Sequence, residues 1–167
     1  LRHYIAFRTG TVEREDMIYI RFRDAMEKDH GTPELFEQEL RTLHQFAVWY
    51  DRLIRPEQEP DVSLREALRR LNILESTTAY PLLLAAYEAY HDRRLSLQGF
   101  LDGLKVLENY LVRRMLVGDN AYTNRMFPSI IKHLSYVNYP DTLRRTLARR
   151  RFIPDNPLRQ ELPNRPL

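Results

Sequence analysis

The sequence has little of what several common classes of site require. Its 167 residues include no cysteine, five glycines and only three lysines. The lack of cysteine excludes a disulfide framework, a thiol nucleophile and a thiolate-ligated metal, and it is compatible with a reducing, cytoplasmic compartment. The few glycines form neither a GxGxxG nor a GxxxxGK[ST] pattern, so the usual phosphate-binding loops are excluded.

The sequence also lacks long apolar runs. None approaches the roughly 18 residues that a membrane span needs, and no secretory signal peptide is recognisable, so we expect no membrane partner. The length is typical of one domain. Because the chain begins at Leu1 rather than at methionine, we expect it to be a piece of a longer protein.

Arginine is nearly the only cation, and its distribution is uneven. Residues 1–138 carry 19 basic and 20 acidic side chains, whereas residues 139–167 carry 7 basic and 3 acidic side chains. The formal charge of +3 therefore comes from the C-terminal part. Guanidinium groups suit planar ion pairs, aromatic stacking and phosphate contacts. The main body has no excess charge of the kind that marks a nucleic-acid-binding domain.

Apolar residues recur at helical spacing along most of the chain. The pattern predicts an all-α bundle of about seven to eight helices with short loops over residues 1–152. After Phe152, four prolines fall within thirteen residues. We therefore expect residues 153–167 to form an extended, proline-rich linker towards a C-terminal domain that lies outside this sequence.

Local signals place the ends of several helices. Thr32 followed by Pro33 predicts a helix start, and Pro56 ends that helix. Ser96 and Gly118 bound a second long helix in the same way. We also expect Thr11 to cap a helix that carries Ile18 and Phe22, and Ser63 to open a capping box. The stretch 81–91 should be buried on most of its sides. Pro128 should kink a helix over 120–137 or delay its start. The first of these helices bears a continuous apolar stripe formed by Phe36, Leu40, Leu43, Ala47, Tyr50 and Ile54.

No pattern of catalytic or metal-binding residues stands out. The five histidines include no HExxH pair, and the scattered carboxylates lie among arginines, as solvated ion pairs do. His30 and Pro33 have the His-x-x-Pro spacing of some metal-dependent nucleases, but no further residues complete such a site, and Pro33 already serves a helix start. We therefore predict no catalytic residue, no metal site and no cofactor in this chain.

Two neighbouring arginines end the second long helix. Arg113 and Arg114 point about 100° apart, so they cannot share one role. Arg114 follows Leu111 by three residues and should lie near the buried face, where it needs a carboxylate or carbonyl partner. A structural interpretation has Arg114 clamping the following loop, residues 119–124; a phosphate contact is the alternative.

A second arginine group lies in the basic C-terminal part. Arg144, Arg145, Arg149, Arg150 and Arg151 fall on or beside a predicted helix over 140–151. Such a patch suits a phosphate backbone, with salt-sensitive binding, and it suits an acidic partner domain equally well. A solvated helix surface is the third interpretation. No aromatic residues interleave with these arginines to stack on bases.

The order of several short motifs resembles the helical region of GmrSD-type restriction proteins. The matching stretches are Leu1–Ile5, Arg8–Gly10, Tyr19 and Phe22, Trp49–Tyr50, Leu53–Ile54, Tyr80–Leu84, Glu108–Arg114, Thr123–Phe127 and Phe152–Asp155. The resemblance covers essentially the whole chain. The family joins a ParB-like nucleotide-hydrolysing domain with an Asp-Gly-Gln-Arg-type motif, a helical region and an HNH-type nuclease domain in modification-dependent restriction and anti-phage defence proteins of prokaryotes.

The resemblance implies that this chain is the non-catalytic helical middle of such a protein. Asp102 and Gly103 are followed by Leu104 rather than glutamine, and the HNH signature is absent. By this interpretation the flanking domains of its own chain are its partners, the tail arginines contact DNA or another domain, and Arg113, Arg114 and Asn124 organise the bundle. The alternative is a helical protein-interaction scaffold with no nucleic-acid role; an autonomous enzyme ranks third.

Overall fold

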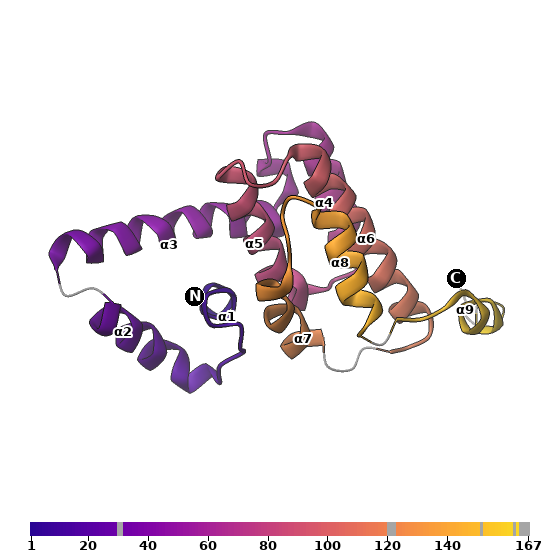
Figure 1. Ribbon diagram of the computed structural model, residues 1–167, viewed down its shortest axis with the longest axis horizontal. Helices are drawn as coiled ribbons and strands as arrows, with labels where there is room; N and C mark the ends of the chain where they lie inside the picture. Colours follow the sequence, from indigo (N-terminus) through magenta and orange to yellow (C-terminus); the bar gives the residue numbers. More distant parts are fainter. Residues whose placement is uncertain (30–31, 120–122, 151, 162, 164–167) are drawn as a thin grey trace.

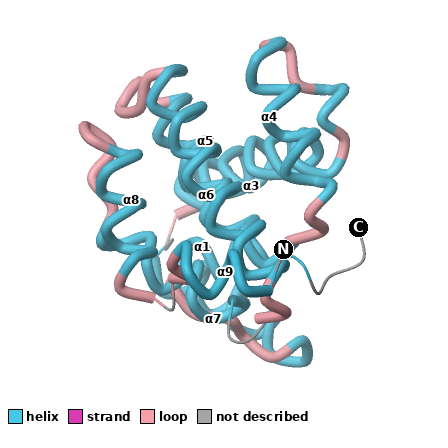
Figure 2. Tube along the Cα trace, turned by 90° about the vertical axis from the view of Figure 1, so that its right-hand side faces the viewer, coloured by secondary structure: helices cyan, strands magenta, loops and turns pink. Residues whose placement is uncertain are grey.

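The computed structural model describes residues 1–29, 32–119, 123–150, 152–161 and 163. Within these residues the secondary structure is entirely helical, which confirms the predicted all-α bundle (Figures 1 and 2). The α-helices are α1 (Arg2–Thr9), α2 (Ile18–Asp29), α3 (Pro33–Ile54), α4 (Val62–Ile73), α5 (Tyr80–His91), α6 (Leu97–Leu116), α7 (Thr123–Ile130), α8 (Tyr139–Ala148) and α9 (Asp155–Glu161). Short 3₁₀ turns occupy Glu15–Met17, Pro56–Gln58, Thr77–Ala79 and Ile131–His133.

The two longest helices begin where the sequence predicts. The hydroxyl of Thr32 accepts a hydrogen bond from the backbone N–H of Leu35, and Pro33 occupies the first turn of α3. Ser96 caps α6 by accepting from the N–H of Gly99 at 3.0 Å. After α6, Gly118 has a φ of +71°, a conformation that glycine adopts without strain.

Two other predicted caps are wrong. Thr11 does not open a helix; its hydroxyl lies 3.0 Å from that of Thr9, and α2 starts only after a 3₁₀ turn. The N-cap of α4 is Asp61, two residues before the predicted Ser63, and its carboxylate accepts from the N–H of Leu64 at 2.8 Å. An aspartate at the N-cap is as effective as a serine, so the local sequence offered two competing starts.

Helix α5 lies at the centre of the core. Its residues Leu82, Leu83, Leu84, Ala85 and Ala86 are all buried, as predicted for this stretch. Helices α1, α3, α6 and α7 all contact it. A helix that is apolar on every side has no face to offer solvent, so the bundle closes around it.

Only part of the apolar stripe of α3 packs against the core, namely Leu43 and Tyr50, and the most deeply buried residues of this helix lie beside the stripe. Phe46, Trp49 and Leu53 face the core, whereas Phe36 and Leu40 remain 46% and 43% exposed. Figure 1 shows α2 and the N-terminal half of α3 on the opposite side of the molecule from α9, and α1 contacts both: it packs against α2, and its Tyr4 donates to Glu39 of α3. The outer part of the stripe is therefore only partly covered by the described residues.

Helices α6 and α8 pack closely because a glycine faces a tyrosine. A Cβ atom on Gly103 would lie 2.3 Å from Cε1 of Tyr139, and Tyr139 is buried. Leu143 and Leu147 of α8 complete the contact and are also buried. This packing fixes the orientation of α8, whose other residues include the tail arginines.

Part of the C-terminal segment that was predicted to be extended is helical. Residues 155–161 form helix α9, which lies at the far end of the molecule from α2 in Figure 1. Pro157 falls in the first turn of α9, where a backbone N–H is not needed, and the N–H of Leu158 bonds to the carbonyl of Pro154. Because Pro157 lies in the first turn of α9, it is compatible with a helix in this proline-rich segment.

The helix predicted over 120–137 is shorter than expected. Helix α7 runs from Thr123 to Ile130 with Pro128 inside it, and a 3₁₀ turn follows. No helix in the described part of the chain is both long enough and apolar enough to cross a bilayer.

Candidate functional site

Part of the predicted arginine patch lines an open groove beside α8. The groove has a volume of about 570 Å³ and is lined by His133, Thr142, Arg145, Thr146, Arg149 and Arg150. We call it the α8 groove. Arg145 lies on α8, Arg149 and Arg150 follow the helix end, and His133 closes the 3₁₀ turn before α8. The histidine was not among the residues singled out from the sequence, because it lies twelve positions before Arg145 and only the fold brings them to one groove.

The three arginines of the α8 groove are exposed and have no ion pair with any carboxylate of the described residues. Many arginines elsewhere are paired: Arg41 with Glu37, Arg69 with Glu66 and Arg94 with Glu88. Thr142 and Thr146 donate their hydroxyl protons to helix carbonyls 2.9 and 2.7 Å away. The positive charge of the groove is therefore carried by side chains that have no acidic partner among the described residues.

The predicted five-arginine patch does not act as one unit. Arg144 pairs with Asp141 at 2.9 Å and borders a different cavity, between α6 and α8. Arg149 is the C-cap of α8 and still donates its N–H to the carbonyl of Arg145, as the helical spacing predicts, whereas Arg150 lies beyond the helix end. Arg151 lies outside the described residues.

Arg113 holds the segment that follows α8. Its guanidinium donates to the carbonyl of Ile153 at 3.1 Å and to the carboxylate of Asp155 at 2.7 Å, and it lies over the ring of Phe152. Its Nε donates to the side chain of Asn109. Arg113 thus joins α6 to the C-terminal segment. The sequence did not indicate these partners in the C-terminal segment.

Arg114 points in a different direction, as the helical geometry predicts. It is buried, and its guanidinium lies 3.2 Å from the carboxylate of Asp119. It also donates to the hydroxyl of Tyr110, which in turn donates to the carbonyl of Arg150. Burial raises the pKa of Tyr110, against the opposing effect of Arg114, so the hydroxyl keeps its proton. The expected clamp on the loop after α6 is present at Asp119.

Asn124, the third predicted organiser, lies in the first turn of α7. Its side chain is outside what the structure describes, so its predicted role stays a prediction.

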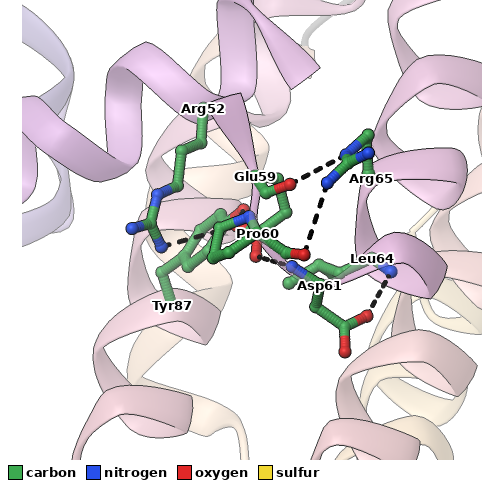
Figure 3. Close-up of polar contacts among 7 residues, drawn as sticks. All are labelled: Arg52, Glu59, Pro60, Asp61, Leu64, Arg65 and Tyr87. Atoms are coloured by element: carbon green, nitrogen blue, oxygen red, sulfur yellow. Dashed lines mark hydrogen bonds and ion pairs between the residues drawn. The ribbon is translucent and has the colours of Figure 1, made fainter. Parts of the chain in front are cut away.

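A buried carboxylate joins α3, α4 and α5 (Figure 3). Glu59 is 2% exposed; it accepts from the Tyr87 hydroxyl at 2.8 Å and from the N–H of Asp61 at 3.1 Å. Arg52 lies 3.5 Å from the same carboxylate, and Arg65 donates to the Glu59 carbonyl. The oxygens of Glu59 already serve the protein's own donors, which points to a structural rather than an acid–base role. Nothing in the sequence marked it, since Glu59 stands in a polar, proline-bounded turn.

The described residues contain no group of three or more acidic or histidine side chains that could hold a metal ion. Comparison with protein-family models, with curated proteins and with solved structures finds no match. The candidate functional site is therefore the α8 groove, with the Arg113 contacts beside it.

Proposed function

We propose that this chain is a non-catalytic helical connecting domain of a GmrSD-like restriction or defence protein. It would couple a nucleotide-hydrolysing domain before it to an HNH nuclease domain after it, and contact DNA. The full-length parent would then be a nucleotide-dependent endonuclease, while this part carries neither active site and no cofactor of its own. The proposal rests on the motif order described above and on two features of the structure.

The observation that best supports a connecting role is the attachment of the C-terminal segment. Phe152, Ile153 and Asp155 all contact Arg113 of α6, and the segment continues as α9. A flexible tether would transmit no change of position between two flanking domains. A segment fixed to the bundle at several points would transmit such a change, as a coupling element must.

The observation that supports a DNA contact is the charge of the α8 groove. Arg145, Arg149 and Arg150 lie only a few residues before the attached segment. A nucleic acid held there would lie close to the place where the chain leaves the bundle. A nuclease domain that follows would then meet the same nucleic acid.

The sequence of the full-length parent tests the connecting role directly. The proposal predicts an Asp-Gly-Gln-type motif upstream of residue 1 and an HNH motif downstream of residue 167. A parent that lacks both motifs would contradict the proposal.

A helical interaction scaffold is the second candidate, and the exposed stripe of α3 favours it. Phe36, Leu40 and Ile54 are 46%, 43% and 45% exposed. They belong to the six-residue stripe of α3, whose members follow steps of four and three as in the seam of a coiled coil. Binding of the chain to duplex DNA in a salt series separates the two candidates. Absence of binding at low salt would favour the scaffold.

A further inference from the structure

We infer that the α8 groove binds the phosphate backbone of a double-stranded nucleic acid without reading its sequence. The inference deepens the DNA contact in the proposed function and rests on it. It narrows the predicted patch to Arg145, Arg149 and Arg150, adds His133, and removes Arg144. It commits to neighbouring phosphates of one duplex as the ligand.

The charges of the groove suit phosphate. Three arginines line one concavity, and the guanidinium group of an arginine presents several N–H donors in a planar fork that matches phosphate oxygens. No described carboxylate neutralises them, whereas Arg144 on the same helix is paired with Asp141. Close like charges repel one another, and this repulsion is relieved when an anion binds between them.

The shape and chemistry of the groove disfavour other anionic ligands. Among the described residues, its lining includes no aliphatic side chain and no phenylalanine, tyrosine or tryptophan; it consists of the arginines, one histidine and two threonines. An acidic protein partner would bury an apolar centre at its interface, which this groove does not offer. A site for a single strand usually offers several large aromatic rings on which successive bases stack, whereas His133 is the one ring that the described residues place in this lining. Contacts to the duplex backbone need neither feature.

Contacts with the core and with α6 fix the backbone of the groove in place. Leu143 and Leu147 anchor α8 in the core, and Tyr110 of α6 donates to the carbonyl of Arg150 at 2.9 Å. The backbone that carries the arginines is thereby fixed before a ligand arrives. Less order has to be gained on binding, so part of the entropic cost of binding is already met by folding.

Fluorescence anisotropy of a labelled 20-base-pair duplex, titrated with the 167-residue chain, tests the inference. The test variant is R145A/R149A/R150A, and the matched control is R41A/R69A/R144A, which removes the same charge from arginines paired with Glu37, Glu66 and Asp141. All six side chains are exposed, so both variants should fold, which circular dichroism would verify. At about 50 mM salt we expect the test variant to bind the duplex at least about 10-fold more weakly than the unaltered 167-residue chain does. The dissociation constant of the control variant should stay within about 3-fold of that of the unaltered chain.

Further arms identify the ligand. Two duplexes of unrelated sequence should bind equally, and a single strand of the same length should bind more weakly. Inorganic phosphate and an acidic peptide should compete only at far higher concentration than unlabelled duplex.

Three outcomes would overturn the inference. If the unaltered 167-residue chain binds duplex but the groove variant binds as well as the control, the groove is not the binding site. The DNA contact of the proposed function would then lie elsewhere on the chain. If the unaltered 167-residue chain does not bind duplex at low salt, both the groove inference and the proposed DNA contact are wrong. A preference for the acidic peptide over the duplex would replace the nucleic acid with a protein partner.

Discussion

The guanidinium of Arg113 lies 2.7 Å from the carboxylate of Asp155, which is 42 residues later in the chain. The same guanidinium also donates to the carbonyl of Ile153. Because Asp155 is the first residue of α9, this pair fixes where the last described helix starts relative to α6. Arg113, together with Tyr110, which donates to the carbonyl of Arg150, thus holds the segment after α8 against α6.

Replacing Arg113 by alanine should release this segment without unfolding the bundle. Asp155 is 65% exposed, so its ion pair contributes only up to about 1 kcal/mol. We expect hydrogen exchange of backbone amides in 152–161 to quicken several-fold, while amides of α5 keep their protection. Arg144→Ala is the control and should leave both regions unchanged. Unaltered exchange in 152–161 of the Arg113 variant would show that other contacts hold the segment.

Replacing Arg114 by leucine should destabilise the whole fold. The change leaves the nearly buried carboxylate of Asp119 without the Arg114 cation, at an expected cost of about 3–5 kcal/mol. The measurement is the free energy of unfolding from urea titration. The double variant R114L/D119L should recover part of the loss, and Arg69→Ala at the surface should cost less than about 1 kcal/mol. A small loss for Arg114→Leu would remove it as an organiser.

Replacing Gly103 by alanine should force α8 away from α6. The new Cβ would lie 2.3 Å from the ring of buried Tyr139, so we expect a loss of about 2 kcal/mol in unfolding free energy. Gly99→Ala on the same helix is the control: its Cβ would meet chiefly the flexible end of Leu95, and the loss should be clearly smaller. Equal losses at both sites would contradict the close packing of α6 and α8.

The stability of the chain should fall as the pH drops below neutral, because of His3. Burial lowers the pKa of His3 from 6.5, and its ring contacts those of Tyr50 and Tyr80. The unfolded chain therefore takes up a proton before the folded one does. The unfolding free energy should decrease as the pH falls through about 6.5 and level off below the lowered pKa of the folded state.

Thermal melts at a series of pH values measure this effect. His3→Phe should flatten the dependence between pH 7 and 5, whereas replacing the exposed His44 by glutamine should leave it as in the parent chain. An unchanged slope in the His3 variant would assign the pH dependence to other groups.

Much of the fold follows from local chemistry. Thr32 with Pro33, and Ser96 with Gly118, set their helix ends because a cap and a left-handed glycine act on the nearest backbone groups. Tertiary competition decided the rest. The apolar stripe that includes Phe36 was correctly placed on one helix, yet the most deeply buried residues of α3 lie beside that stripe, which helical spacing alone does not distinguish.

The candidate site shows the same division. The direction of Arg114 towards the loop after α6 was predictable, since it follows from helix geometry and the cost of burying a charge. The split between Arg144 and Arg145 follows from the same geometry, because adjacent residues on a helix point about 100° apart and Asp141 lies three residues before Arg144. The contribution of His133 and the contacts of Arg113 with the C-terminal segment involve residues far apart in the chain, and only the fold brings them together.

The salt dependence of duplex binding is the sharpest test of a phosphate contact at the α8 groove, because it reports how many phosphates the chain contacts. The logarithm of the association constant, plotted against the logarithm of salt concentration, should fall on a line whose slope is about −0.9 for each phosphate contacted. If the α8 groove is the contact, R145A/R149A/R150A should reduce that slope by about 2–3, and R41A/R69A/R144A should leave it nearly unchanged. Lines of equal slope for the unaltered 167-residue chain and the groove variant would contradict a phosphate contact at the α8 groove.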